Sequence, residues 1–157
     1  MKEETRTASD TAPGARPRLL TAGAPGIRGR IKVEFDDFRV EEIPLYAPAG
    51  EGEHTFFEIE KRGVPTFQAV REIARALRVN PREIGYAGLK DTHAVARPVL
   101  SVHGVSPEEV LRLKLPSIRI LWASRHTNKL RVGHLAGNRF IIRVRDAPEG
   151  ALAACRE

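Results

Sequence analysis

The pattern of apolar and polar positions predicts short strands interrupted by two helices. Alternation at every second residue is typical of half-buried strands, whereas spacings of three and four are typical of helices. The predicted strands cover residues 30–35, 38–43, 55–61, 84–87, a stretch beginning at about 95, 118–123 and 140–144. Because strands and helices are interspersed without regular βαβ alternation, we expect an α+β fold with a mixed or antiparallel sheet and flanking helices.

The first helix is predicted over residues 66–79. Thr66 can cap its N-terminus through the side-chain oxygen, and Pro81 ends it at about Val79. The apolar residues that share one face of this helix are Phe67, Val70, Ala74 and Leu77.

A second helix is predicted from residue 106. Ser106, Pro107 and Glu109 form a capping-box sequence with proline in the first turn. We expect this helix to end at Leu113 or Leu115.

Both ends of the chain depart from this pattern. Residues 1–25 are rich in Thr, Ala, Pro, Gly and Arg without an apolar period, which predicts a disordered tail. Residues 148–157 are similar to the opening of another helix that the chain end truncates. We therefore expect residues 26–147 to form the ordered domain, as the N-terminal part of something longer.

Composition narrows the class of protein. A single cysteine, Cys155, among 157 residues excludes an internal disulfide framework, a Cys-rich zinc site and a CxxC redox pair, and favours a reducing, cytoplasmic compartment. No apolar run is long enough to span a membrane, and the N-terminus lacks a secretory signal. The five histidines have no metal-ligand spacing, and no GxGxxG or P-loop is present, so we expect no metal, no nucleotide cofactor and, by default, a monomer.

Charge is distributed unevenly along the chain. Residues 110–145 contain nine Lys and Arg and no acid, whereas residues 34–60 contain nine Asp and Glu and one base. Such blocks indicate an anionic polymer such as a nucleic acid as partner. They are equally compatible with a basic sheet face that pairs with the acidic segment inside the same fold.

The segment from residue 84 to 102 holds the candidate chemistry. Gly88 allows a sharp turn after a predicted strand, and Lys90 and Asp91 follow it directly. A carboxylate on a tight loop between two strands can act as nucleophile, base or ligand, and a nearby cation would keep it ionised. The alternative is an ordinary turn aspartate that caps its own loop.

Four segments together resemble one family, the TruD-type tRNA pseudouridine synthases. GYAGLKD followed by THAVA resembles the family's A-G-x-K-D-x-x-A-V-T-x-Q signature, and IKVEFDDFRVEEI resembles its D-F-x-V-x-E opening. GEGEHTFFEIEKRGVPTFQAVREIARAL is similar to the next block of the family, and NKLRVGHLAGNRFIIRVR to its K-L-R-x-G-x-L-x-G-N-x-F motif. The segments occur in family order and cover residues 31–145.

The resemblance implies an isomerase that converts a uridine of tRNA, usually uridine 13, to pseudouridine without a cofactor. It assigns the catalytic carboxylate to Asp91, and leaves open whether that group attacks the sugar, attacks the ring or removes a ribose proton. Lys32 is implied as the partner of Asp91, and Phe140, with Asn138 beside it, as the stacking platform for the extruded base. Without the family, Lys32 is a solvated strand lysine and Phe140 a core residue.

Further residues are expected to support substrate binding. Lys90 is taken as a supporting residue beside Asp91. The expected phosphate contacts are Arg71, Arg75, Lys129, Arg131 and Arg139.

The chain departs from the family pattern in sequence and in length. Thr92 stands where a basic residue is frequent, and Ala96 and Pro98 replace the threonine and glutamine of the signature. Family members are about twice as long, so we expect an incomplete domain with exposed apolar surface and unpaired strand edges. The alternatives are a non-catalytic RNA-binding module or inactive truncated synthase, and a structural ribonucleoprotein component.

Overall fold

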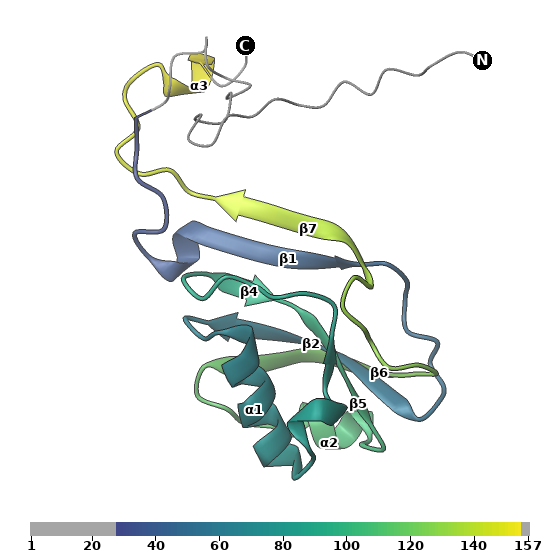
Figure 1. Cartoon of the computed structure of the whole chain (residues 1–157). Coiled ribbons are helices and arrows are strands. Elements are labelled where there is room, and N and C mark those ends of the chain that lie inside the picture. The colour runs from purple at the N-terminus through teal and green to yellow at the C-terminus, as the bar shows by residue number, and fades with distance from the viewer. Residues whose placement is uncertain (1–27, 155–157) are drawn as a thin grey trace, which may run out of the picture. The chain divides into compact units, whose positions relative to one another are not determined.

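The computed structural model describes residues 28–154, and the predicted tail at 1–25 lies outside them. Residues 28–148 form one compact unit, and residues 149–154, with the short helix α3 (Ala151–Ala154), belong to a second one. The elements of the first unit are, in chain order, η1 (Phe35–Asp37), β1 (Phe38–Pro44), β2 (His54–Arg62), α1 (Thr66–Leu77), η2 (Pro81–Glu83), β3 (Gly85–Tyr86), β4 (Val95–Arg97), β5 (Val99–His103), α2 (Pro107–Leu111), β6 (Ile118–His126) and β7 (Leu135–Ile142) (Figure 1).

The seven strands form one mixed sheet, as the sequence predicts. Its order is β3-β5-β2-β4-β1-β7, and β6 pairs with β2. Only β1 and β4 run parallel among the described pairs, and the other pairs are antiparallel. β2 is nine residues long, so it pairs with β5 over 54–58 and with β4 only at 61–62. This arrangement places β1 between β4 and β7.

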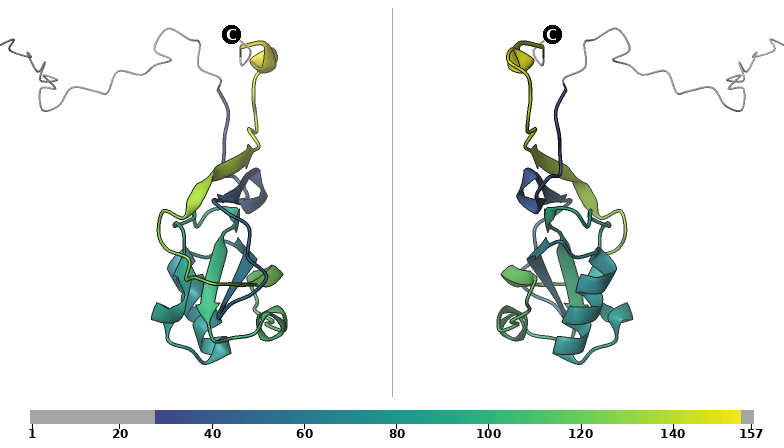
Figure 2. Two further views of the ribbon diagram at one scale, coloured as in Figure 1. Left: turned by 90° about the vertical axis from the view of Figure 1, so that its right-hand side faces the viewer. Right: turned by 90° about the vertical axis from the view of Figure 1, so that its left-hand side faces the viewer.

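Helix α1 packs on one face of the sheet (Figure 2). Its fully buried residues Ala69, Ile73 and Ala74 contact a core that includes Phe57 and Ile59 of β2. Burying a side chain such as Ile73 contributes about 1.5–3 kcal/mol. The buried face of α1 differs from the predicted one. Phe67, which was predicted to be buried, is 52% exposed, whereas Ile73, which was not, is buried.

Two local predictions near the N-terminal half are wrong. Residues 30–35 do not form a strand, because Lys32 has a φ of 57°, which breaks the extended conformation, and Phe35 begins a 3-10 turn. Thr66 does not cap α1, because Pro65 occupies the N-cap and the Thr66 hydroxyl hydrogen-bonds residue 90 instead.

Other boundaries are confirmed or shifted by a few residues. The Ser106 capping box is present, with Glu109 N donating to Ser106 Oγ at 3.2 Å and Ser106 N donating to Glu109 Oε2 at 2.9 Å. The helix it opens ends at Leu111, earlier than predicted. The predicted strand at 84–87 shrinks to 85–86, that at 118–123 extends to 126, and that at 140–144 lies at 135–142.

The basic and acidic segments pair with each other inside the fold. Arg145 donates from Nε to the buried Asp37 at 2.7 Å, and this hydrogen bond lowers the pKa of Asp37 to about 2. The further pairs between the two segments are Arg119–Glu60 (2.9 Å), Arg139–Glu41 (3.6 Å), Arg143–Asp37 (3.7 Å) and Arg145–Glu34 (3.2 Å). Uneven charge along this chain is thus in part a consequence of which strands meet, and it does not by itself indicate a nucleic-acid partner.

Candidate active site

Strand register brings the predicted site residues to one pocket. Val40 of β1 lies opposite Phe140 of β7 and opposite Ala96 of β4, and Glu42 lies opposite Asn138. Because side chains alternate along a strand, these residues all face the same side of the sheet. The pocket has a volume of about 170 Å³ and is lined by Phe38, Val40, Leu89, Lys90, Asp91, Asn138 and Phe140.

Asp91 lies on the loop between β3 and β4, and its side chain is 40% exposed. The ammonium of Lys32 donates a hydrogen bond to its carboxylate, and that bond is the main cause of a lowered pKa for Asp91. The charge of Lys32, the backbone N–H of His93 and the charge of Lys61 lower the pKa of Asp91 further. The carboxylate is therefore ionised near neutral pH, as a nucleophile or a base requires.

Lys32 is held in place rather than solvated. Its side chain is 30% exposed, and its ammonium lies 4.2 Å from the centroid of the Phe38 ring. A cation over an aromatic face is stabilised by about 0.5–1 kcal/mol at such partly exposed sites. The left-handed backbone at Lys32 is thus part of the geometry that directs this side chain to Asp91.

Phe140 is a pocket residue and not part of the core. Its side chain is 55% exposed and meets the Phe38 ring edge-on, with the centroids 5.9 Å apart. Asn138, two residues earlier on the same face of β7, is also exposed. An aromatic ring left accessible beside an ionised carboxylate can stack against a planar group.

The ammonium of Lys90 is engaged inside the fold, although the residue lines the pocket. Its ammonium pairs with Glu42 at 2.5 Å, and the two side chains are only 3% and 1% exposed. Sequence reasoning treated Lys90 as a possible substrate contact, but the structure uses it to anchor the loop to β1. It also missed Glu42, whose position among alternating apolar residues of β1 was the available signal.

A second buried lysine lies beneath the loop. Lys61 of β2 is fully buried, and its ammonium donates to the carbonyls of Val64 at 2.7 Å and Asp91 at 2.8 Å. Thr66 Oγ1 accepts from the backbone N–H of Lys90 at 2.9 Å. Sequence reasoning missed Lys61 too, although it follows Phe57 and Ile59 on the inward face of one strand.

The two signature replacements are buried in the sheet. Ala96 is fully buried between Lys61 of β2 and Val40 of β1 in the register of the sheet. Pro98 is buried between β4 and β5, and its carbonyl accepts from Ile59 N at 3.1 Å. Neither side chain lines the pocket, whereas Thr92 is exposed on the loop.

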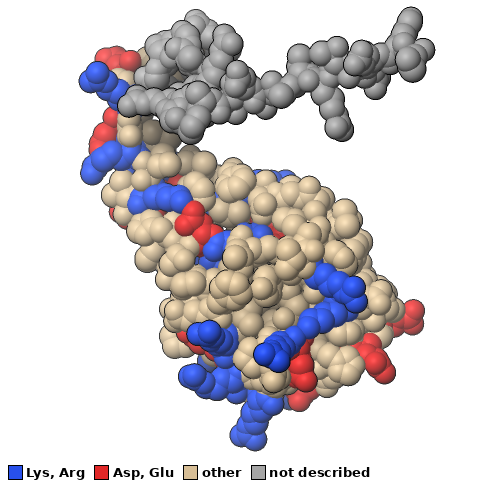
Figure 3. All heavy atoms as spheres, in the orientation of Figure 1, with Lys and Arg blue, Asp and Glu red and all other residues tan. Residues whose placement is uncertain are grey.

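The predicted phosphate contacts do not surround the pocket evenly. Arg71 and Arg75 are exposed on α1, and Lys and Arg side chains gather over the lower part of the molecule where α1 lies (Figure 3). Arg131 is exposed, and Lys129 donates to the carbonyl of Arg82 at 2.5 Å. Arg139 points to the opposite face of β7 from Asn138 and Phe140, where it pairs with Glu41.

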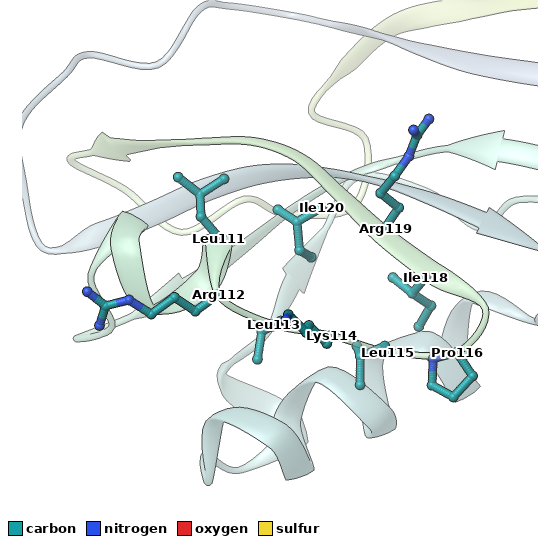
Figure 4. Close-up of a pocket in the computed structure, with 9 residues that line it drawn as sticks. All are labelled: Leu111, Arg112, Leu113, Lys114, Leu115, Pro116, Ile118, Arg119 and Ile120. Atoms are coloured by element: carbon teal, nitrogen blue, oxygen red, sulfur yellow. The ribbon is translucent and has the colours of Figure 1, made fainter.

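A wider groove elsewhere lacks acid–base chemistry. It has a volume of about 740 Å³ and lies where α2 leads into β6 (Figure 4). Its lining is apolar and basic, without a carboxylate or a histidine: Leu111, Arg112, Leu113, Lys114, Leu115, Pro116, Ile118, Arg119 and Ile120. Within residues 28–154, no group of three or more His, Cys, Asp or Glu side chains could hold a metal ion. Nor does that part of the chain contain a helix long and apolar enough to cross a membrane.

Comparison with known proteins identifies the family of this chain. The profile described as tRNA pseudouridine synthase D (TruD) matches residues 17–156. The chain belongs to the TruD family. The resemblance seen in the four sequence segments is thereby confirmed.

The individual relatives agree with this assignment. tRNA pseudouridine synthase D of Geobacter metallireducens is 60% identical over 136 residues, which cover 87% of this chain and 34% of the relative. That of Syntrophotalea carbinolica is 56% identical over 138 residues, covering 88% of this chain and 35% of the relative. The chain thus spans about one third of the length of these curated relatives.

A solved structure supports the fold. The crystal structure of a Methanosarcina mazei protein, provisionally described as tRNA pseudouridine synthase D, superposes with a TM-score of 0.82 at 29% sequence identity. The match covers 88% of this chain and 32% of the other. The mixed sheet is therefore the fold of the corresponding part of that protein.

Proposed function

We propose that this chain carries the catalytic carboxylate of a tRNA pseudouridine synthase, with Asp91 as that group and uridine 13 as its target. One observation carries the proposal: an ionised carboxylate paired with Lys32 shares a pocket with the exposed ring of Phe140. Membership of the TruD family supports the substrate class.

The reaction sets clear demands on these residues. Conversion of uridine to pseudouridine breaks the N1–C1′ glycosidic bond and forms a C5–C1′ bond. The proton lost from C5 is balanced by one taken up at N1, so the reaction is an isomerisation and no external oxidant or reductant is needed. An ionised Asp91 can begin this by attacking the sugar or the ring, or by removing a ribose proton, and each route needs the base extruded from its stack. Stacking of the extruded base on Phe140 would contribute about 1–3 kcal/mol and so offset part of the free-energy cost of unstacking.

Binding of the RNA strand is assigned to cations outside the pocket. Arg71, Arg75, Lys129 and Arg131 form no ion pair with a carboxylate among residues 28–154, so phosphate can take them without breaking one. Arg139 would have to exchange Glu41 for phosphate, which makes it the weakest of the predicted contacts. Asn138 is proposed to hydrogen-bond the base edge beside Phe140.

A second candidate function is RNA binding without catalysis. Ala96 and Pro98 favour it, because they replace the threonine and glutamine of the signature with side chains that cannot hydrogen-bond the Asp91 loop or the RNA. The two functions differ in a single variant, Asp91→Asn, which removes the charge and keeps the shape.

The test measures release of tritium from unmodified tRNA labelled at C5 of uridine. Two proteins are assayed, the chain itself and the product of the longest open reading frame that contains it. A tRNA in which cytidine replaces uridine 13 is the substrate control. Release by wild type, lost in Asp91→Asn with unchanged tRNA affinity, supports catalysis. Binding without release in both proteins favours the second candidate, and continued release from the substituted tRNA contradicts the uridine 13 assignment.

A further inference from the structure

We infer that Lys61 is a positioning residue, whose buried ammonium fixes the backbone turn that presents the Asp91 carboxylate to the pocket. The inference rests on the proposed function, because it assigns to Lys61 a role in the same reaction. It concerns a residue of β2 that does not line the pocket and cannot contact a substrate there.

The contacts of Lys61 join two segments. Its ammonium donates to the carbonyl of Val64, in the connection from β2 to α1, at 2.7 Å, and to that of Asp91 at 2.8 Å. A third, longer bond goes to the carbonyl of Lys90 at 3.4 Å. The three donors of one ammonium therefore all end on backbone oxygens, two of which belong to the loop that carries the candidate carboxylate.

Burial of Lys61 makes the loss of these hydrogen bonds energetically costly. An ammonium taken fully out of water is costly unless its protons are bound, so the carbonyls of the loop cannot leave Lys61 without exposing an unsatisfied charge. Thr66 adds a bond to the backbone N–H of Lys90 from the first turn of α1. The loop is thus held by a core strand and a helix, as precise sites require.

The surrounding charges explain why Lys61 acts on Asp91 in particular. Lys90 has its own buried partner, Glu42, whereas the hydrogen bonds of Lys61 go to no carboxylate. Asp91 is the opposite charge that acts on it, and Asp91 is shared with Lys32. Lys61 and Lys32 therefore act together on one carboxylate, from beneath and from the side.

Titration of Lys61 gives a distinctive readout. Burial lowers the pKa of Lys61 to about 8, with the charge of Lys90 lowering it further and that of Asp91 opposing the shift. Above this pH the neutral amine keeps two donors for three carbonyls and no longer attracts Asp91. The rate of the chemical step should consequently fall above about pH 8, while tRNA affinity changes less.

The experiment compares Lys61→Met with Ile59→Val in the longest open reading frame that contains the chain. Ile59 lies two residues earlier on the same buried face of β2, and its backbone N–H donates to Pro98, outside residues 88–93, so the variant reports on lost packing. Single-turnover rates, tRNA dissociation constants and pH profiles are measured for both. We expect Lys61→Met to lower the single-turnover rate by about 100-fold, which is the effect of a small misplacement of a reacting group. The affinity for tRNA should be retained, and the decrease in rate above about pH 8 should disappear from the pH profile. If Lys61→Met changes neither the single-turnover rate nor its decrease at alkaline pH, the inference is overturned.

Two further measurements keep the question decidable. Hydrogen exchange of the amides of residues 88–93 should accelerate in Lys61→Met and not in Ile59→Val, and equal exchange in both overturns the inference. If Lys61→Met does not fold, Lys61→Arg replaces it, since an arginine keeps its charge and should move the alkaline limb above pH 8. Absence of pseudouridine formation in wild type refutes the proposed function alone, and the exchange data then decide the role of Lys61.

Discussion

Lys32 pairs with Asp91 across 59 residues of sequence, and it does so from a backbone with positive φ. The pair couples the segment that precedes β1 to the loop that follows β3. Its function is electrostatic, because the hydrogen bond and charge of Lys32 keep the Asp91 carboxylate ionised. Four predictions test this arrangement and its surroundings.

Lys32→Met should narrow the pH range of activity from the acid side. The pKa of Asp91 is lowered in the wild type, so its carboxylate stays ionised to lower pH than an ordinary aspartate. Without Lys32 that pKa rises, and the acid limb of the single-turnover rate moves to higher pH. Lys32→Arg keeps the cation and should keep the limb. An unmoved limb in Lys32→Met would show that another group keeps Asp91 ionised.

Phe140→Ala should weaken the reaction without unfolding the protein. Loss of stacking worth about 1–3 kcal/mol predicts a decrease of about 5- to 150-fold in the rate divided by the dissociation constant. Because the ring is 55% exposed, the free energy of unfolding in urea should change by no more than about 0.5 kcal/mol. Ile142→Ala, two residues along the same face, is the matched control. Equal losses in both variants would count against stacking.

Glu42→Ala should destabilise the fold more than any pocket variant. It leaves the Lys90 ammonium buried without a partner, and breaking such a pair costs about 3–5 kcal/mol. Urea unfolding of Glu42→Ala, Glu42→Leu, Lys90→Met and the combined Glu42→Leu and Lys90→Met variant measures this. The combined variant should recover most of the lost stability, since neither charge is then stranded. Additive losses would mean that the pair is not coupled.

Arg75→Ala should lower the dependence of tRNA affinity on salt. Arg75 is exposed on α1 and forms no ion pair with a described carboxylate, so a phosphate contact through it releases a counterion. The slope of log affinity against log salt should decrease in magnitude by about one. Arg39→Ala, which removes an arginine already paired with Asp36 at 3.0 Å, serves as control. A slope unchanged by Arg75→Ala would remove α1 from the RNA-binding surface.

Local signals predicted the parts of this fold that depend on neighbours in sequence. The capping box at Ser106 and the alternation along β2 each express a short-range physical rule, and the structure contains both. The strand expected at residues 30–35 was wrong. Alternating side chains predict a strand there, but the backbone of Lys32 adopts a positive φ, and its side chain pairs with Asp91, which lies far along the chain.

Long-range relationships could not be predicted in the same way. Whether Arg139 binds phosphate or Glu41 depends on β7 lying beside β1, and no property of residue 139 indicates that neighbour. That Lys61 and Glu42 both contact the Asp91 loop depends on the sheet register, which the alternation along their own strands does not specify. Family resemblance supplied Asp91, Lys32 and Phe140, but it did not supply the residues that hold the loop from beneath.

The row formed by Lys61, Ala96, Val40 and Phe140 has a consequence for how the site assembles during folding. Its members come from four strands, and the β1 partners in β4 and β7 are roughly 55 and 100 residues away in sequence. Since side chains alternate, a slip of β1 by one residue would turn Val40 and Glu42 outward and bring Arg39 and Glu41 beneath Asp91. The pocket therefore depends on pairings of high contact order, and the appearance of its ion pairs during refolding should report correct strand register.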